Sequence, residues 1–295
     1  MTARLDLQRL GLVVHPHRDV ARALDAIHAW AGRHEADVVQ LPVSGQERVV
    51  AEFGDAATCD LVLALGGDGT TLAALHLAAA AGRPVLGVAC GSLGALTATS
   101  ADELEEALQA IEAGAWRPRI LPGAAIAPDG GEPEVALNDL VVIRRGAGQI
   151  AIGIDVDGDR YVRFAGDGVV IATPLGSSAY TMAAGGPILA PASRGLVLTP
   201  LAPHGGCCPP LVVGPESHVT VTIEPGHSGA RLEFDGQIQL LEPHRLDVSW
   251  RAEHATLVAF EDAEPLLAGL RRRRILMDSP RVLARDDRAA ATTRR

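Results

Sequence analysis

The sequence predicts an α/β domain with a parallel sheet at the N-terminus, followed by an all-β, sandwich-like domain and one last helix. Strand-like and helical patterns alternate from residue 10 to residue 114, as in a parallel sheet with helices on both faces. After Trp116 the chain changes to short β-rich runs separated by Gly, Pro and Asp-Gly, at the spacing of a β-sandwich. Leucines recur at helical spacing near the C-terminus. The predicted units are residues 1–116, residues 117–262, a helical segment at 263–283 and a disordered tail at 284–295.

Composition excludes several classes of protein. The 295 residues are 47% hydrophobic with a formal net charge of -10 and 3% aromatics, so the basic stripe and stacking residues of a nucleic-acid binder are missing. No run approaches the ~18 apolar residues of a membrane span, and the N-terminus does not resemble a signal peptide. The four cysteines form no C-x-x-C pair, which argues against a zinc site or a disulfide framework. We expect a cytoplasmic protein without a membrane or nucleic-acid partner, and we assign no metal-ligating residues.

The elements of the first domain follow from apolar runs and helical periodicity. Strands are expected at residues 10–15, 38–41, 61–65 and 85–89. Helices are expected at residues 19–34, 45–53, 70–81 and 104–111. Ser100 and Glu103 have the spacing of a capping box in front of the last of these helices.

The glycine-rich stretch at residues 66–70 lies between a continuous apolar run and an alanine-rich helix. Such a run is typical of a strand whose two faces are both covered by helices. Gly67 and Gly69 allow φ > 0 and a close approach to the main chain, and Thr70 and Thr71 can cap the helix that follows. Free amides at a helix N-terminus attract phosphate. The loop is therefore a candidate phosphate site.

Asp68 is unusual within that loop, because it places a carboxylate where anionic oxygens would arrive. This is tolerable if a divalent metal lies between the carboxylate and the phosphates, or if the carboxylate accepts a proton from a hydroxyl. The alternative is a surface turn in which Asp68 only caps the helix, and the loop alone leaves both interpretations open. The chain has no lysine, which excludes the P-loop.

The second domain is predicted as β-rich with one short helix. Asp157-Gly158 is a hairpin signal, and residues 177–184 are the expected helix. Strands are expected at residues 135–145, 149–156, 160–165, 169–172, 211–213, 218–224, 231–234, 245–250 and 255–260.

Polar groups interrupt these strands. Asn138 and Asp139 are adjacent in an apolar run, so they point to opposite faces and at least one needs a buried partner, unless the pair lies at a bulge or an edge. Asp167 and Asp235 each precede a glycine. Residues 173–180, TPLGSSAY, combine hydroxyls with a helix start, which suits hydrogen bonding to a base, a ribose or a phosphate.

Together these motifs resemble those of the NAD kinase family, in order and approximate spacing. GGDGT alone is shared with diacylglycerol and sphingosine kinases, whereas the second-domain motifs belong to NAD kinases. The resemblance covers residues 10–276. The motifs are GGDGT at 66–70, Asn138-Asp139, GDG at 166–168, TPLGSSAY at 173–180, AGGP at 184–187, Pro203-His204 and FDGQ at 234–237.

The resemblance implies a site between the two domains, with the final helix returning to the first. It implies ATP and NAD as substrates, transfer of the ATP γ-phosphoryl group to the adenosine 2′-hydroxyl of NAD, Mg²⁺ accompanying ATP, and a homodimer or homotetramer. Asp68 would be the catalytic carboxylate. Gly67, Gly69 and Thr70 would shape the phosphate loop, Asn138 and Asp139 would bind adenine and ribose, Ser178, Ala179 and Tyr180 would line the adenine pocket, and Asp167 would face the nicotinamide half.

Some positions depart from the family pattern. Ala89 replaces an asparagine, Ala95 a phenylalanine, Asp139 a glutamate and Leu175 a small hydroxyl residue. These departures fit a divergent NAD kinase. They also leave open a kinase of another hydroxyl substrate, such as a lipid or a nucleotide, and a weakly catalytic nucleotide-binding regulator. ATP versus polyphosphate and NAD versus NADH stay open as well.

Overall fold

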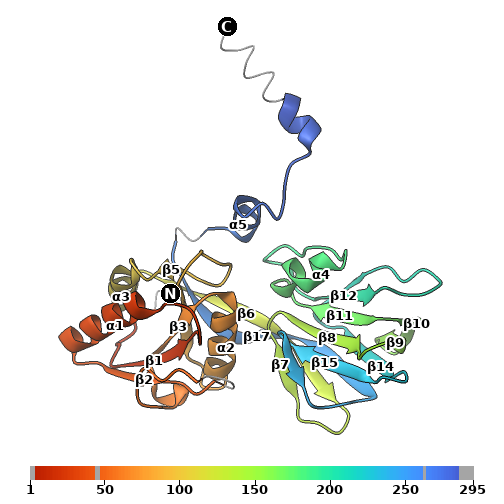
Figure 1. Cartoon of the computed structure of the whole chain (residues 1–295), viewed down its shortest axis with the longest axis horizontal. Helices are drawn as coiled ribbons and strands as arrows, with labels where there is room; N and C mark the ends of the chain where they lie inside the picture. Colours follow the sequence, from red (N-terminus) through yellow and green to blue (C-terminus); the bar gives the residue numbers. More distant parts are fainter. Residues whose placement is uncertain (1–3, 44–46, 262–263, 286–295) are drawn as a thin grey trace.

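The computed structural model describes residues 4–43, 47–261 and 264–285, which form two lobes side by side (Figure 1). The path of the larger sheet, β10-β9-β14-β17-β4-β3-β1-β2, runs through both lobes. The predicted fold class, an α/β domain followed by a β-sandwich, is confirmed. The division at residue 116 stays a prediction, because the sheet is continuous across it.

The first lobe is a parallel sheet covered on both faces. Its strands pair in the order β2-β1-β3-β4, all parallel. Alternate residues of β3 enter different cores, since Leu63 packs with α1 and α3 whereas Val62 packs with α2, as the two-residue period of a strand requires. The elements are β1 (Arg9–Val14), α1 (Ala21–His34), β2 (Asp37–Gln40), the 3₁₀ turn η1 (Ala56–Thr58), β3 (Leu61–Gly66), α2 (Asp68–Ala79), β4 (Pro84–Ala89), β5 (Thr99–Ser100) and α3 (Leu104–Glu112).

The second lobe is a sandwich of two sheets. A six-stranded sheet in the order β13-β12-β11-β8-β15-β16 packs on β9, β14 and β17 through one apolar core. Asp157 and Gly158 have positive φ at the predicted hairpin turn. The elements are β6 (Arg117–Pro128), β7 (Glu134–Ala136), β8 (Asp139–Arg144), β9 (Ile150–Val156), β10 (Asp159–Gly166), β11 (Gly168–Ala172), η2 (Gly176–Ser178), α4 (Tyr180–Ala183), β12 (Leu196–Leu201), β13 (Leu211–Val213), β14 (His218–Glu224), β15 (Ala230–Phe234), β16 (Gln237–Gln239) and β17 (Arg245–Ala259).

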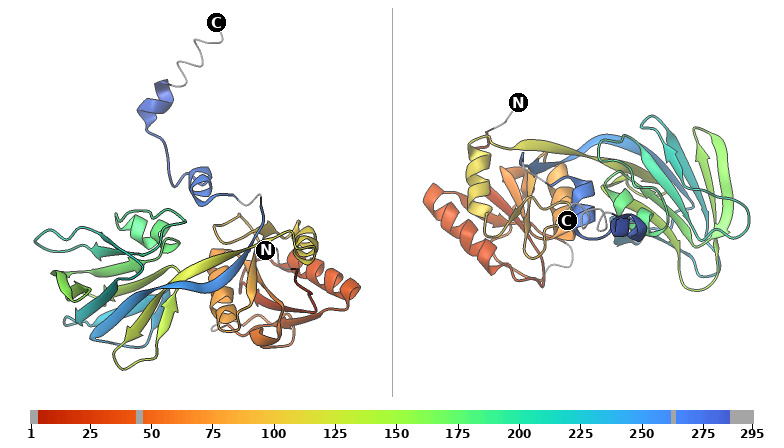
Figure 2. Two further views of the ribbon diagram at one scale, coloured as in Figure 1. Left: turned by 180° about the vertical axis from the view of Figure 1, so that it is seen from behind. Right: turned by 90° about the horizontal axis from the view of Figure 1, so that it is seen from above.

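Strand β17 joins the lobes. It pairs antiparallel with β14 and β6 in the second lobe, and Thr256 and Leu257 pair parallel with β4 of the first. Figure 2 shows β6 and β17 crossing together from one lobe to the other. The sequence predicted two strands here, but one strand continues through a register shift between Arg251 and Ala255. Strands β5, β6, β12 and β16 were not predicted. Prolines within β6 and β12, such as Pro122 and Pro200, are typical of loops and strand edges.

Three local predictions in the first lobe are wrong. Residues 47–53 of the expected helix 45–53 are not helical, because the buried side chain of Gln40 accepts from Val50 N and donates to Arg48 O, which holds this segment beside β2. Residues 44–46 lie outside the described residues. The capping box is also absent, since Glu103 is the N-cap of α3 and the Ser100 hydroxyl bonds to the Glu103 carboxylate instead.

The third concerns α2, which begins at Asp68, two residues before the expected start at residue 70. Its N-cap is Gly67, so Thr70 and Thr71 lie inside the first turn and do not cap it. The Thr71 hydroxyl donates to Gly67 O within the helix. Gly67 and Gly69 are not among the residues with positive φ, so neither uses the left-handed conformation that glycine allows.

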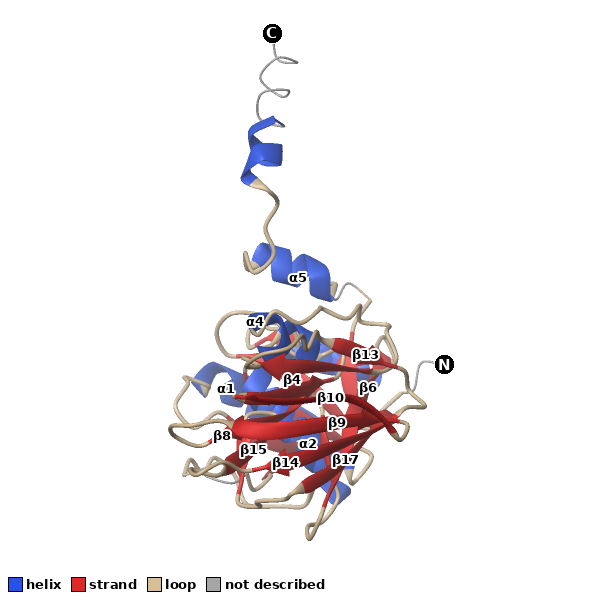
Figure 3. Ribbon diagram, turned by 90° about the vertical axis from the view of Figure 1, so that its right-hand side faces the viewer, coloured by secondary structure: helices blue, strands red, loops and turns tan. Residues whose placement is uncertain are grey.

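The C-terminal helix α5 (Leu266–Arg272) is shorter than the predicted 264–276. It lies above the junction of the lobes, with Gly269 and Leu270 buried (Figure 1). The chain then leads away from both lobes through a helical stretch at 280–285 (Figure 3). Packing of α5 on the first domain stays a prediction. Residues 284 and 285 of the predicted disordered tail 284–295 are helical, and the rest of that tail lies outside the described residues. No helix in the described part of the chain is long and apolar enough to cross a membrane.

Candidate functional site

Asp68 is the first residue of α2, at the carboxyl end of β3. Its carboxylate accepts two backbone hydrogen bonds from the loop after β4: Ala95 N donates to Oδ2 at 3.0 Å and Leu96 N donates to Oδ1 at 2.9 Å. A Cβ at Gly94 would lie 2.1 Å from Oδ1, so the loop wraps the carboxylate tightly. Asp68 is half-buried, and each oxygen keeps a lone pair for another donor. The carboxylate is oriented and still accessible.

The residues that follow Gly67 complete the turn. Gly67 and Thr70 are buried and Gly69 is exposed. The first amides of α2 lack partners within the helix, so this end of the helix can bind an anion, as predicted from the sequence.

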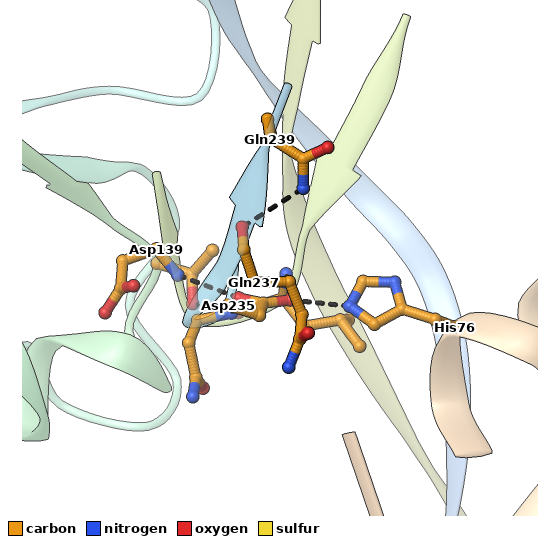
Figure 4. A network of polar contacts seen from close by, with 8 residues as sticks. His76, Asp139, Asp235, Gln237 and Gln239 are labelled. Atoms are coloured by element: carbon orange, nitrogen blue, oxygen red, sulfur yellow. Dashed lines mark hydrogen bonds and ion pairs between the residues drawn. The ribbon is translucent and has the colours of Figure 1, made fainter. Parts of the chain in front are cut away.

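Asp235 organises the facing part of the second lobe. It has φ 49° in the turn after β15, and its side chain is only 2% exposed. Its carboxylate accepts from the backbone amides of Leu137, Asn138 and Asp139, at 2.8, 2.6 and 3.0 Å. His76 Nε2, from α2 of the first lobe, lies 2.6 Å from Oδ2 (Figure 4). The carboxylate is thus saturated, and it ties the helix that begins at Asp68 to the start of β8.

Asp139 is a buried carboxyl without a described cationic partner. It is 6% exposed, and its pKa is raised to about 7 by burial first and then by the charges of Asp235 and Glu233. Both protonation states are therefore accessible near neutral pH, so the group can either donate or accept a hydrogen bond.

The TPLGSSAY turn packs directly on Asn138. Thr173 N donates to Asn138 O at 2.9 Å and the Thr173 hydroxyl donates to Leu137 O at 2.6 Å. A Cβ at Gly176 would lie 2.1 Å from Asn138 O. The structure therefore brings Asn138 and Asp139 together with the turn that carries a half-buried Ser178 and an exposed Ala179 and Tyr180.

A shared apolar cluster brings these groups against α2. Leu137, directly before Asn138, lies in the same buried cluster as Leu72 and Leu75 of α2 and Leu96 of the Asp68 loop. Leu175 packs against this cluster from the TPLGSSAY turn. The two halves of the site thus meet along one helix.

Asp167 does not lie near Asn138 and Asp139. In the ladder between β11 and β8, Ala172 pairs with Asp139 at one end and Gly168 pairs with Ile143 at the other. Asp167, directly before Gly168, is therefore roughly 15 Å from Asp139, given the rise per residue of a strand. Arg144 Nε donates to Asp167 Oδ1 at 2.6 Å.

Sequence reasoning missed the role of His76. It singled out Asp235 as oddly polar, but nothing in the sequence indicates that an imidazole 159 positions away bonds to it. His254 lies next to this pair, with ring centroids 6.3 Å from His76. Burial, followed by the charges of Arg251 and His76, lowers the pKa of His254 to about 4.

The described residues contain no cluster of three or more side chains suited to hold a metal ion. At the phosphate loop the available donor is the Asp68 carboxylate. This fits Mg²⁺, which is usually bound by one or two carboxylates together with substrate phosphates and water.

Comparison with known proteins matches both lobes to one family. The model described as the ATP-NAD kinase N-terminal domain matches residues 11–116, and that described as the ATP-NAD kinase C-terminal domain matches residues 137–258. The NAD kinase of Desulforamulus reducens is 35% identical, covering 79% of this chain and 85% of the relative. The NAD kinase of Moorella thermoacetica is 32% identical, covering 87% and 86%.

Two solved structures share the architecture. An NAD kinase from Archaeoglobus fulgidus in complex with ATP has a TM-score of 0.67 at 26% identity, covering 86% of this chain and 94% of the other. Yeast NADH kinase complexed with NADH has a TM-score of 0.76 at 22% identity, covering 92% and 89%. The yeast enzyme is similar in fold alone.

Proposed function

The chain belongs to the ATP-NAD kinase family, and we propose that it is itself an NAD kinase, which transfers the γ-phosphoryl group of ATP to the adenosine 2′-hydroxyl of NAD to give NADP. One observation carries the proposal beyond family membership. The accessible carboxylate of Asp68 begins α2, and the same helix reaches the Asn138–Asp139 strand through His76 and Asp235. The helix therefore links a candidate base to a candidate acceptor site.

In the proposed reaction Asp68 accepts or orients the proton of the 2′-hydroxyl. The bond from O2′ to the γ-phosphorus forms, the bond from that phosphorus to the bridging oxygen breaks, and ADP leaves. The amides of Ala95 and Leu96 fix the direction of the carboxylate, which serves the positioning on which phosphoryl transfer depends. Gly67, Gly69 and Thr70 shape the phosphate loop.

The acceptor side is proposed from the second lobe. Asn138 and Asp139 hydrogen-bond adenine and ribose, and Asp139 suits either polarity because its pKa is raised to about 7. Ser178, Ala179 and Tyr180 line the adenine pocket. Asp167 is proposed to face the nicotinamide half, at the end of β11 opposite the adenine pocket.

Mg²⁺ is proposed to accompany ATP and to neutralise developing charge on the phosphates when bound. Asp68 is the residue that would hold it, through a carboxylate oxygen. A homodimer or homotetramer and a cytoplasmic location complete the proposal, and both rest on the family resemblance.

A panel of acceptors tests the function. NAD, NADH, nucleosides and diacylglycerol are each incubated with ATP and Mg²⁺, and phosphorylated product is measured. We expect a dinucleotide to be the preferred acceptor. Phosphorylation of another compound in preference to both dinucleotides would favour the second candidate, a kinase of a different hydroxyl substrate, which Ala95 and Leu175 make worth testing.

A further inference from the structure

The turn that follows β1 places an arginine over the glycine-rich loop. Arg18 Nη1 would lie 3.1 Å from a Cβ at Gly67 and 3.4 Å from a Cβ at Gly91, and it lies 3.5 Å from Gly66 O. The guanidinium therefore covers the start of α2, next to the loop that holds Asp68. Arg18 is exposed, so its remaining donors are open to solvent.

The backbone of this turn is held from two sides. His15 Nδ1 accepts from His17 N and Arg18 N, both at 3.1 Å. Arg48 Nη1 donates to Arg18 O at 2.7 Å. Burial first, and then the charges of Arg18, His17 and Arg48, lower the pKa of His15, which favours the neutral imidazole whose Nδ1 accepts these bonds. The position of Arg18 over the loop is thus built by its neighbours.

The charge of Arg18 is not compensated within the described part of the chain, where no carboxylate lies at ion-pair distance from it. Other arginines differ, since Arg22 pairs with Asp102 at 2.5 Å and Arg33 pairs with Glu105 at 2.6 Å. Burial lowers the pKa of Arg119, another cation near the loop, and the charge of Asp68 opposes that shift. In a chain without lysine, Arg18 is the uncompensated cation over the glycine turn.

We propose that Arg18 is a ligand of the donor phosphates, whose guanidinium binds two phosphate oxygens of ATP above Gly66 and Gly67. A planar guanidinium matches two phosphate oxygens at once. It brings a fixed positive charge to the position where Asp68 would otherwise repel the donor. This inference rests on the proposed use of a triphosphate donor, and it adds a phosphate contact from a turn outside the GGDGT motif.

Binding measurements separate a phosphate contact from a structural role. Arg18→Ala, Arg18→Lys and the control Arg22→Ala are titrated by calorimetry with ATP and Mg²⁺, with inorganic tripolyphosphate and with adenosine. For Arg18→Ala we expect ATP and tripolyphosphate to bind more weakly by about tenfold or more, the effect of losing charge-assisted hydrogen bonds, with adenosine unchanged. Arg18→Lys restores part of the loss, because it keeps the charge without the fork. Arg22→Ala binds like wild type.

Other outcomes overturn the inference. Equal weakening of adenosine and ATP by Arg18→Ala, or ATP binding unchanged from wild type, would show that Arg18 does not contact phosphate. Failure of wild type to bind ATP would overturn both the inference and the proposed function. If wild type binds ATP through Arg18 and phosphorylates no dinucleotide, only the proposed acceptor is wrong.

Discussion

Asp68 and Asp235 are both followed by glycine and both accept backbone amides, yet the structure uses them differently. Asp68 is half-buried and accepts two amides. Asp235, with a side chain that is 2% exposed, accepts three amides and contacts His76. The first carboxylate keeps lone pairs for a substrate, and the second is occupied by the fold. We therefore propose that a similar local sequence serves chemistry in one lobe and positioning in the other.

The largest effect is expected from Asp68→Asn. The amide cannot accept the hydroxyl proton, and loss of a general base typically lowers turnover ~10²- to 10⁴-fold. Its NH₂ group also faces one of the two donating amides, so a small loss of stability accompanies the loss of turnover. Steady-state kinetics and thermal unfolding measure the two effects.

Asp60→Asn is the matched control for that change. Asp60 also holds two backbone amides of the first lobe, Gln8 N at 2.9 Å and Arg9 N at 2.8 Å, but it lies at the opposite end of β3 from Asp68. Both amides bond to the same oxygen, Oδ2, so the asparagine side chain can keep both bonds through its amide oxygen. The control should therefore change stability and turnover little. If Asp68→Asn retained turnover within a few-fold of wild type, Asp68 would be structural, like Asp235.

The next largest effect is expected from Asp235→Ala, measured as the free energy of unfolding. Three amides at the start of β8 would lose their acceptor, and each buried unsatisfied group costs ~1–3 kcal/mol, so we expect a loss of about 3 kcal/mol or more, with a raised KM for the dinucleotide. His76→Ala should cost only ~1 kcal/mol, since Asp235 keeps its three amides.

His28→Ala, at an exposed position of α1, is the control for His76→Ala. Equal losses of stability for Asp235→Ala and His76→Ala would contradict the view that the three amides are the larger part of this contact.

The sequence predicted the elements more reliably than the contacts between them. The continuous apolar run at 61–65 was enough to predict the buried strand, and the motifs were enough to predict the family, which the comparisons confirm. The helix expected at 45–53 does not form, because the side chain of Gln40, outside the segment, accepts a hydrogen bond from Val50 N. The His76–Asp235 contact joins two lobes, and no local pattern encodes it. The position of Arg18 was missed because no local pattern indicates that its side chain lies beside Gly66, 48 residues away.

A pH effect of intermediate size is expected from Asp139. Its folded pKa of about 7 lies above the usual 3.8, so the folded state holds the proton more tightly than the unfolded chain. Stability from this group is present below pH ~4 and is lost as pH rises through 7. Asp139→Asn removes this titration. The melting temperature of the variant minus that of wild type should therefore increase from pH 5 to pH 8.

The opposite contribution of His254 cancels in this comparison. The pKa of His254 is lowered from 6.5 to about 4, so the stability that this group contributes is lost as pH falls from 6.5 towards 4. The loss is equal in wild type and in the variant. A difference in melting temperature that is constant from pH 5 to pH 8 would show that Asp139 does not titrate near 7.

The smallest expected effect concerns Ala95, where the family has a phenylalanine. Leu175 packs against the cluster that includes Leu137 and Leu96, the neighbour of Ala95 in sequence, so we expect Leu175 to fill part of the space beside Ala95. Ala95→Phe alone should therefore not tighten NAD, whereas Ala95→Phe combined with Leu175→Thr should tighten it up to about tenfold, since an aromatic contact adds ~0.5–1.5 kcal/mol beyond burial. Calorimetry on wild type, both single variants and the double variant measures this. If Ala95→Phe alone tightens NAD, Leu175 does not fill the space. If neither change does, while another hydroxyl compound binds wild type well, the pocket recognises a different acceptor and the second lobe differs from its relatives in substrate as well as in sequence.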